Sequence, residues 1–293
     1  MPTPQALVTV EPVESRKQLK RFAEIPYVLH GHEQRWTPDV RAYEQWRLDS
    51  RRHPYFERGD AAFLLARQAG APIGRIAAHI DGSGSQQGWF GMFDVPDDLE
   101  VTRALLDAAR GWLAEQGVTS MTGPVSWTPD EDFGVLVEGF DRAGATGRPW
   151  HPPCYAEQLR ALGAEPGERR ATYDLDTAIA GWDAPPPADE PTPPHAGAYA
   201  DPALVLDGVA AVPDVSRMLA GASVREAWRL ARTARDRTFE TAVCVRCDGD
   251  PAALVPRLLS ACRINGYTRL LSPWAPDQRP PDRVHQVFTL PVP

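Results

Sequence analysis

Two neighbouring places in the sequence carry side chains that could accept a proton. Asp130-Glu131-Asp132 is a run of three carboxylates, which are groups that bind cations or act as general bases. The alternative for this run is a solvated acidic loop. His151 has an ordinary pKa of about 6.5 and could also act as a general base, or it could pack beside Trp150.

Other classes of catalytic or metal site lack their sequence patterns. The chain has no Gly-x-Ser-x-Gly elbow, Walker loop or dinucleotide-binding Gly-x-Gly-x-x-Gly. Cys244 and Cys247 form a Cys-x-x-Cys pair on a predicted strand, where residues three apart point to opposite faces. Cys154 and Cys262 are isolated. We therefore predict no metal site and expect the cysteines to pack as small hydrophobic residues.

An alternation of strands and helices should position these groups. Apolar residues recur on one face of the segments 15–30, 40–49, 99–116 and 155–162, which predicts helices, with Ser15 as an N-cap. Strands are predicted at 7–10, 61–67, 73–80, 90–95, 118–122 and 171–175. The helix 99–116 lies between two strands, so the first half contains a βα unit within a sheet.

A proline-rich segment divides the chain into two predicted units. Residues 181–198 contain many prolines, which favour an extended linker over a helix or a central strand, and the alternative is a proline-rich recognition ligand. The predicted units are therefore residues 1–180 and 199–293. In the second unit a strand at 240–247, a helix at 252–265 and a strand at 268–272 repeat the βα order. Gly117 precedes Pro124, and Gly266 precedes Pro273, by seven residues each, which indicates a duplication unless βα packing alone explains it.

Composition limits the kinds of partner. The 293 residues, 43% of them hydrophobic, can form two domains or one large one. No run of about 18 apolar residues predicts a membrane span, and residues 1–14 do not resemble a secretory signal. Four cysteines do not form a disulfide framework, so we expect a cytoplasmic protein. A net charge of -8 disfavours binding to nucleic acid or to an anionic membrane.

A series of short motifs in the first 176 residues resembles the GNAT superfamily of N-acetyltransferases, and in particular an uncharacterised bacterial branch of it. The motifs are His53 to Glu57, Gly74 to Ala78, Gly88 to Phe93, Ala104-Leu105-Leu106, Gly123-Pro124, Gly139-Phe140-Asp141, and Pro152-Pro153 with Tyr155. The resemblance implies an α/β fold with a mixed sheet whose fourth and fifth strands splay apart. It also implies that acyl-CoA enters between these strands and that its pyrophosphate meets the start of the following helix. The second unit would be a smaller α/β unit that resembles half of the same fold.

The cofactor site implied by the resemblance departs from the family pattern. The phosphate loop of the family reads Gln/Arg-x-x-Gly-x-Gly/Ala, and these positions fall on Asp97, Glu100 and Thr102 here. No glycine is present there, and carboxylates stand where the anion would bind. The alternative role of these acids is to stabilise the helix, by roughly 0.3–1 kcal/mol each. The implied cofactor-binding residues are Phe93, Val95, Thr102 and Arg103.

The resemblance also implies the catalytic residues. Many family members place a tyrosine acid on the fourth helix at a position that falls on Leu159 here, and Tyr155, one turn earlier on the same face, could replace it. Tyr155 could instead be a half-buried structural residue after the proline pair. Among the three carboxylates, Glu131 is the predicted base or amine anchor because an acid stands there in the branch that the chain resembles. His151 stands where that branch usually carries Asn.

The resemblance implies N-acyl transfer from acetyl-CoA or another acyl-CoA to a small amine, in specialised metabolism. The alternative is a protein of GNAT shape that has lost CoA binding. Such a protein would use the cleft for another ligand or reaction, or would be a non-catalytic binding module. The acidic phosphate-loop positions favour this alternative, and the remaining motifs do not discriminate between the two.

Overall fold

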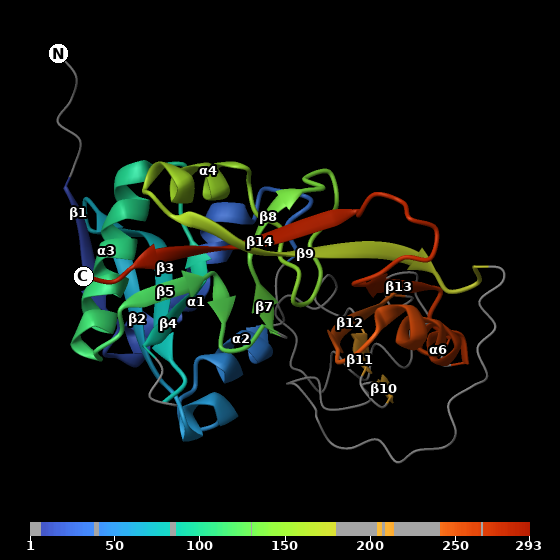
Figure 1. Cartoon of the computed structure of the whole chain (residues 1–293). Helices are drawn as coiled ribbons and strands as arrows, with labels where there is room; N and C mark the ends of the chain where they lie inside the picture. Colours follow the sequence, from blue (N-terminus) through green and yellow to red (C-terminus); the bar gives the residue numbers. More distant parts are fainter. Residues whose placement is uncertain are drawn as a thin grey trace.

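The computed structural model describes residues 7–37, 41–82, 86–129, 131–179, 204–206, 209–213, 241–264 and 266–293. They form an α/β structure around a long mixed sheet (Figure 1). The strands are β1 (Val8–Pro12), β2 (Asp60–Gln68), β3 (Ala71–Ile80), β4 (Gln87–Asp94), β5 (Ser120–Gly123), β6 (Val125–Ser126), β7 (Asp132–Phe133), β8 (Val135–Glu138), β9 (Glu165–Asp176), β10 (Leu204–Leu206), β11 (Val209–Pro213), β12 (Thr241–Cys247), β13 (Arg269–Ser272) and β14 (Arg283–Pro291). The helices are α1 (Arg16–His30), α2 (Arg41–Arg47), α3 (Leu99–Glu115), α4 (Cys154–Ala161) and α6 (Pro251–Ile264), with a short 3-10 turn at Pro54–Glu57.

The first half of the sheet carries the predicted splay. Strands β1 to β4 pair with their neighbours in antiparallel order, and β4 then runs parallel to β5. The β4–β5 pairing ends at Trp89 and Thr122, so the two strands separate after that point. The predicted α/β fold with splayed central strands is therefore confirmed.

Helix α3 covers one face of this sheet because its apolar residues recur at helical spacing. Val101, Leu105, Ala109 and Leu113 are all buried against the strands. Asp98 caps the helix by accepting a hydrogen bond from Glu100 N at 2.9 Å. Helix α1 begins with the predicted cap, since Ser15 and Gln18 form a reciprocal capping box.

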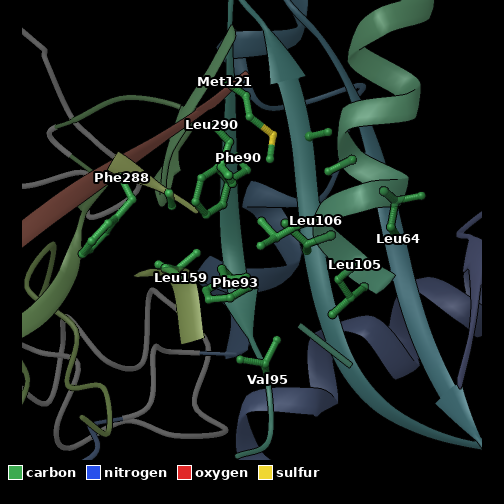
Figure 2. Packing of buried hydrophobic residues seen from close by; sticks show 14 of the residues in the cluster. Leu64, Phe90, Phe93, Val95, Leu105, Leu106, Met121, Leu159, Phe288 and Leu290 are labelled. Carbon is green, nitrogen blue, oxygen red and sulfur yellow. The ribbon is translucent and has the colours of Figure 1, made fainter. Parts of the chain in front are cut away.

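The last strand of the chain belongs to the first half of the sheet, and the sequence did not predict it. Strand β14 pairs with β5 on one side and with β9 on the other. Figure 2 shows Phe288 and Leu290 of this strand beside Phe90 of β4 and Leu159 of α4 in one apolar cluster. Residues near the C-terminus therefore complete the core around the splayed strands.

The second βα unit follows the predicted order. The strand predicted at 240–247 is present as β12 from residue 241, and residue 240 lies outside the described residues. Strands β12 and β13 run parallel, with helix α6 between them in sequence. Strand β9 pairs with both β13 and β14, so it connects the two halves edge to edge. The proline-rich segment 181–198 lies outside the described residues, and the unit boundaries stay a prediction.

No helix among the described residues is long and apolar enough to cross a membrane. Within those residues, no group of three His, Cys, Asp or Glu side chains could hold a metal ion.

Candidate functional site

The splayed end of β4 is irregular, and a second chain segment crosses it. The pairing of β4 with β3 shifts between Gly91 and Asp94, which leaves a bulge at Met92 and Phe93. Met92 has a positive φ of 44°. Its amide donates a hydrogen bond to Ser126 Oγ at 3.1 Å, because β6 crosses at this point. A side chain at Gly91 would meet the Val125 carbonyl at 2.2 Å, so the crossing requires glycine there.

A cavity of about 80 Å³ opens beside this bulge, between β4 and the segment from β6 to Gly134. Its volume can hold several water-sized groups. We call it the charged cavity, because its walls include two guanidinium groups and three carboxylates. The polar and aromatic residues in its walls are Tyr27, Trp36, Thr37, Glu44, Arg47, Arg75, Phe93, Asp94, Ser126, Asp132 and His151.

A chain of buried ion pairs runs along the wall of the charged cavity. Arg75 of β3 lies 2.6 Å from Asp94 and 2.6 Å from Glu44. Arg47 lies 3.6 Å from Glu44 and 2.6 Å from Asp132. Of the three carboxylates, Asp132 has the most accessible side chain, at 20%. A positively charged group that enters the cavity would therefore disturb fewer existing ion pairs by binding to Asp132 than by binding to Glu44 or Asp94.

The electrostatics of the cavity keep the inner carboxylates ionised. Burial alone would raise the pKa of Asp94, but the Arg75 guanidinium and His30 outweigh it and hold that pKa far below its ordinary value. The pKa of Glu44 is lowered in the same way, because Arg75 and Arg47 outweigh the effect of burial. Two inner carboxylates that stay ionised and paired are poor general bases, so the proton of an incoming amine needs another acceptor.

The structure places His151 in the wall of the charged cavity. Its Nδ1 atom accepts a hydrogen bond from the Leu136 amide at 3.3 Å. Burial lowers the pKa of His151 to about 4, although the charge of Asp94 opposes this shift. His151 is therefore neutral near pH 7 and has one ring nitrogen already engaged.

Tyr155 is not among the residues that line the charged cavity, but its ring packs beside that of His151. Its ring is fully buried, and its hydroxyl accepts a hydrogen bond from the Val95 amide at 2.9 Å. The same hydroxyl lies 2.9 Å from His30 Nε2. Burial and the Asp94 carboxylate raise the pKa of Tyr155 well above its ordinary value. This geometry favours the structural interpretation of Tyr155 and shows that the Val95 amide, a predicted cofactor contact, is already bonded.

Glu131 is not among the residues that line the charged cavity. Its carboxylate lies 3.4 Å from His53 Nε2, and the neighbouring Asp132 takes the cavity position. The choice of Glu131 from the acidic run stays a prediction, but the geometry favours the next residue in the run. Asp130 lies outside the described residues.

The start of α3 is closed by protein contacts where a pyrophosphate would bind. Thr102 is fully buried, and its hydroxyl donates to Gln158 Oε1. The amide of the same Gln158 donates to Asp97 Oδ1 at 3.3 Å. Arg103 is half-exposed and lies 3.6 Å from Glu100. The Thr102 hydroxyl is therefore engaged inside the protein, and a role of Thr102 and Arg103 in cofactor binding stays a prediction.

A second cavity, of about 430 Å³, opens beside this turn, between the end of α1 and the start of α4. Its walls include the carboxylates of Glu33, Asp97 and Glu157, and no arginine or lysine is among the described wall residues. His30 and His32 also line it and Glu33 is paired with Arg35 at 2.6 Å, so Asp97 and Glu157 are the carboxylates there that would oppose a pyrophosphate. The residues present do not fit the phosphate groups of CoA at the place where the resemblance puts them.

The sequence reasoning missed the ion-pair chain. Arg75 and Asp94 fall within two predicted strands whose other residues are mostly apolar. A charged residue in such a strand is a usable signal, because a buried charge needs a partner. Arg75 and Asp94 are 19 positions apart, and Glu44 comes from α2. They could not be identified as ion-pair partners without knowing the strand pairing.

Comparisons with known proteins agree with this architecture. No family model matches the sequence. Protein YghO from Escherichia coli (strain K12) is 33% identical over 158 residues, which are 52% of this chain and 40% of that protein. A protein named bacterial ceramide synthase, from Caulobacter vibrioides (strain NA1000 / CB15N), is 32% identical over 155 residues, which are 51% of this chain and 40% of that protein. The matched part of the chain thus spans about two fifths of each relative.

Solved structures extend the similarity to nearly the whole chain. A tandem GNAT protein from the clavulanic acid biosynthesis pathway aligns over 98% of this chain and 99% of its own, with a TM-score of 0.55 and 16% identity. A GCN5-related glucosamine N-acetyltransferase region of a fungal multi-domain GH3 beta-N-acetylglucosaminidase aligns over 97% of this chain and 38% of that one, with a TM-score of 0.53 and 11% identity. The chain therefore has a GNAT fold.

Proposed function

We propose that this protein is an N-acyltransferase that transfers an acyl group from a thioester to an amine held in the charged cavity. The observation that carries the proposal is the position of this cavity beside the β4 bulge, at the point where β4 leaves β5. Splayed strands leave a gap at this place, which suits a planar acyl group. The carboxylates opposite suit a cationic amine.

The reaction needs a neutral amine next to the thioester carbonyl. The amine nitrogen attacks the carbonyl carbon, a C–N bond forms, the C–S bond breaks, and the thiolate leaves with the former bonding electrons. The amine loses one proton during this step. In our proposal Asp132 anchors the ammonium form, which first gives one proton to water beside Asp132 and so becomes the neutral amine. The proton lost during the attack follows the same route, and the thiolate takes a proton from solvent. Asp132 has this role because its side chain is the most accessible of the three carboxylates.

The name of one relative supports transfer to nitrogen. A ceramide is the amide of a fatty acid with a long-chain amino alcohol, so a ceramide synthase forms an N-acyl bond. That relative is 32% identical to this chain over about half of it. The sequence predicted a small amine as the acceptor, and the similarity adds the proposal that the amine carries an alkyl chain.

A groove next to the charged cavity is suited to such a chain. The groove has a volume of about 770 Å³ and runs between α1, α2 and β2. Tyr27 and Glu44 lie in the walls of both the groove and the charged cavity. Its apolar wall residues are Val13, Leu19, Ala23, Leu48, Phe56, Ala61 and Phe63. An amine at Asp132 would place its tail toward these residues, where each buried methylene contributes about 0.8 kcal/mol.

One observation favours the alternative function, a GNAT-shaped protein that does not bind CoA. Asp97 and Glu100 stand in the turn where the resemblance puts the pyrophosphate of CoA, and Asp97 also lines the second cavity. If they exclude the cofactor, then the charged cavity and the groove would bind an amphiphilic amine without reaction. Binding of the amine is common to both proposals, whereas transfer of the acyl group separates them.

The test is an acyl-transfer assay with acetyl-CoA and long-chain acyl-CoA as donors and a series of primary alkylamines as acceptors, with the amide detected by mass spectrometry. We expect amide formation that becomes more efficient with acceptor chain length. The variant Ala23→Trp, which fills the groove, should remove the dependence on chain length while a short amine still reacts. Saturable amine binding by calorimetry without amide formation would support the binding protein, and no binding of any amine would refute both proposals.

A further inference from the structure

We propose that His151 acts as a neutral hydrogen-bond donor to the carbonyl oxygen of the acyl group, rather than as the general base that its residue type suggests. This inference rests on the acyl transfer proposed above. It follows from which ring nitrogen is already bonded, from what surrounds the ring, and from the place of His151 in the wall of the charged cavity.

The backbone fixes the tautomer of His151. The Leu136 amide donates to Nδ1 at 3.3 Å, so this nitrogen carries a lone pair and no proton. In a neutral imidazole the proton must then be on Nε2. Leu136 is held in β8, where it pairs with His285 of β14, so the sheet positions the donor.

The neighbours of His151 keep the ring neutral and fixed. Its ring lies 5.2 Å from the ring of Tyr155, and Tyr155 in turn lies 5.4 Å from the ring of Phe93. The charged or titratable groups that act on it are Asp94 of β4, His30 of α1 and His285 of β14. Burial dominates over all of these, so a proton on Nδ1 would cost both desolvation and the Leu136 hydrogen bond.

The wall of the charged cavity around β4 has few backbone donors left for an oxyanion. The Met92 amide is bonded to Ser126 Oγ, and the Val95 amide is bonded to Tyr155. His151 and Phe93 both lie in the cavity wall. In the proposal the Nε2–H group of His151 therefore adds a preorganised donor beside β4, where the Met92 amide is engaged and so is the amide of Val95, the residue after the strand.

The step is balanced without any change in the protonation of His151. When the amine nitrogen attacks, one electron pair of the C=O bond moves to oxygen, and the oxyanion accepts the hydrogen bond from Nε2–H. When the C=O bond re-forms, the C–S bond breaks and the thiolate leaves. The amine proton leaves through water near Asp132, and His151 keeps its own proton throughout.

Two substitutions separate the donor role from a structural role. His151→Gln can place an amide N–H near the Nε2 position but loses the acceptor for Leu136. His151→Asn keeps an acceptor near the Nδ1 position and loses the donor into the cavity. We expect kcat to fall about 100-fold or more in the Asn variant, and about tenfold or less in the Gln variant. Acyl transfer by the Asn variant at the wild-type rate would overturn the proposal.

The tautomer itself can be read without turnover. Nitrogen NMR of the protein with labelled histidine should show a protonated Nε2 and an unprotonated Nδ1 for His151, unchanged from about pH 6 to about pH 8. A proton on Nδ1, or titration within that interval, would overturn the inference. If the tautomer is as expected but the protein acylates no amine, the proposed function is refuted, and the catalytic role of His151 is refuted with it. If the wild-type protein acylates amines and kcat falls much more in His151→Asn than in His151→Gln, the result supports the donor role of His151.

Discussion

The chain contains two splayed strand pairs with the same backbone plan and different contents. In the first half β4 and β5 run parallel for three pairs of residues, and in the second half β12 and β13 do the same. Each longer strand has a shifted register beyond that point, between Gly91 and Asp94 in β4 and between Cys244 and Arg246 in β12. A turn containing aspartate and a helix follow each strand.

What fills the two splays differs. The first splay holds the ion-pair chain and the charged cavity. In the second, an apolar core packs around β12 and β13, Ala145 from the first half packs with Val243 and Leu271, and the printed ion pair of these two strands is the partly exposed one between Arg269 and Asp174. Burial raises the pKa of Cys262 in this core to about 12, so its thiol stays protonated. The comparison shows that the βα unit fixes the opening of the strands, whereas the residues placed inside it decide whether chemistry is possible there.

The largest expected effect is that acid lowers the stability of the first half, around β4 and β5, more than that of the second half, around β12 and β13. Burial lowers the pKa of His79 and His151 to about 4 and of His285 to about 3, against about 6.5 in the unfolded chain. The unfolded state therefore binds more protons below pH 6.5, so stability is lost as the pH falls from about 6.5 toward the folded pKa values. At about pH 5 each histidine should lower the free energy of unfolding by about 2 kcal/mol.

Hydrogen exchange as a function of pH checks this prediction. Residues 241–272 contain no histidine, so β12 and β13 should keep their protection after β4 and β5 have lost theirs. The variant His32→Gln is the control, because this side chain is exposed. Equal loss of protection in both regions at about pH 5 would contradict the comparison.

Removal of the central guanidinium should also affect the first region more than the second. Arg75→Met leaves Asp94 and Glu44 buried without the partner that each has at 2.6 Å. An unpaired buried charge costs about 3–5 kcal/mol, which should be seen in urea unfolding. Arg103→Met is the control, because its ion pair with Glu100 is half-exposed and contributes less than about 1 kcal/mol. A loss below about 1 kcal/mol in Arg75→Met would show that the ion-pair chain is not structural.

Substitutions of Asp132 and of its neighbour Glu131 test whether the amine acceptor binds in the charged cavity between β4 and β5. Asp132→Asn should lower kcat/KM for the amine about tenfold to hundredfold, because a hydrogen bond to a charged group contributes about 1.5–3 kcal/mol. Glu131→Gln should change it about twofold or less, since this residue faces His53. The reverse order would restore Glu131 as the base that the sequence predicted. Urea unfolding of Asp132→Asn is needed beside the assay, because Arg47 loses its partner at 2.6 Å.

Local patterns predicted most of the elements but not their assembly. Ser15, the apolar face of 99–116 and the Gly266 turn are local signals, and the helices begin and end within a few residues of the predicted positions. Strand β14 was missed because buried His285 and Gln286 interrupt its apolar pattern. Its pairing with β5, more than 150 residues away, is a non-local contact that no sequence period encodes.

The candidate site was predicted in part, for the same reason. His151 was chosen because its residue type is informative by itself; the structure places it in the cavity wall, and its role stays a prediction. The choice among Asp130, Glu131 and Asp132 depends on which way a short hairpin turns, and side-chain direction there alternates from one residue to the next. Arg75, Asp94 and Glu44 come from three separate elements, so their meeting required the fold.

The smallest expected effect concerns the turn before α3. If Asp97 and Glu100 repel the pyrophosphate, then Asp97→Gln combined with Glu100→Gly should raise the affinity for acyl-CoA. Two anions about 4 Å apart repel by roughly 4 kcal/mol at an effective dielectric constant of 20, and exposure and salt reduce this value. A glycine in the first turn costs the helix about 1 kcal/mol, and Asp98 remains as the cap. We expect a net gain of about tenfold in affinity by calorimetry. Asp107→Gln, which removes a charge further along the same helix, should leave the affinity unchanged. A folded double variant without the gain would mean that this turn is not the obstacle, and the turn from Asp248 to Pro251 before α6 would then be the next place to seek cofactor binding.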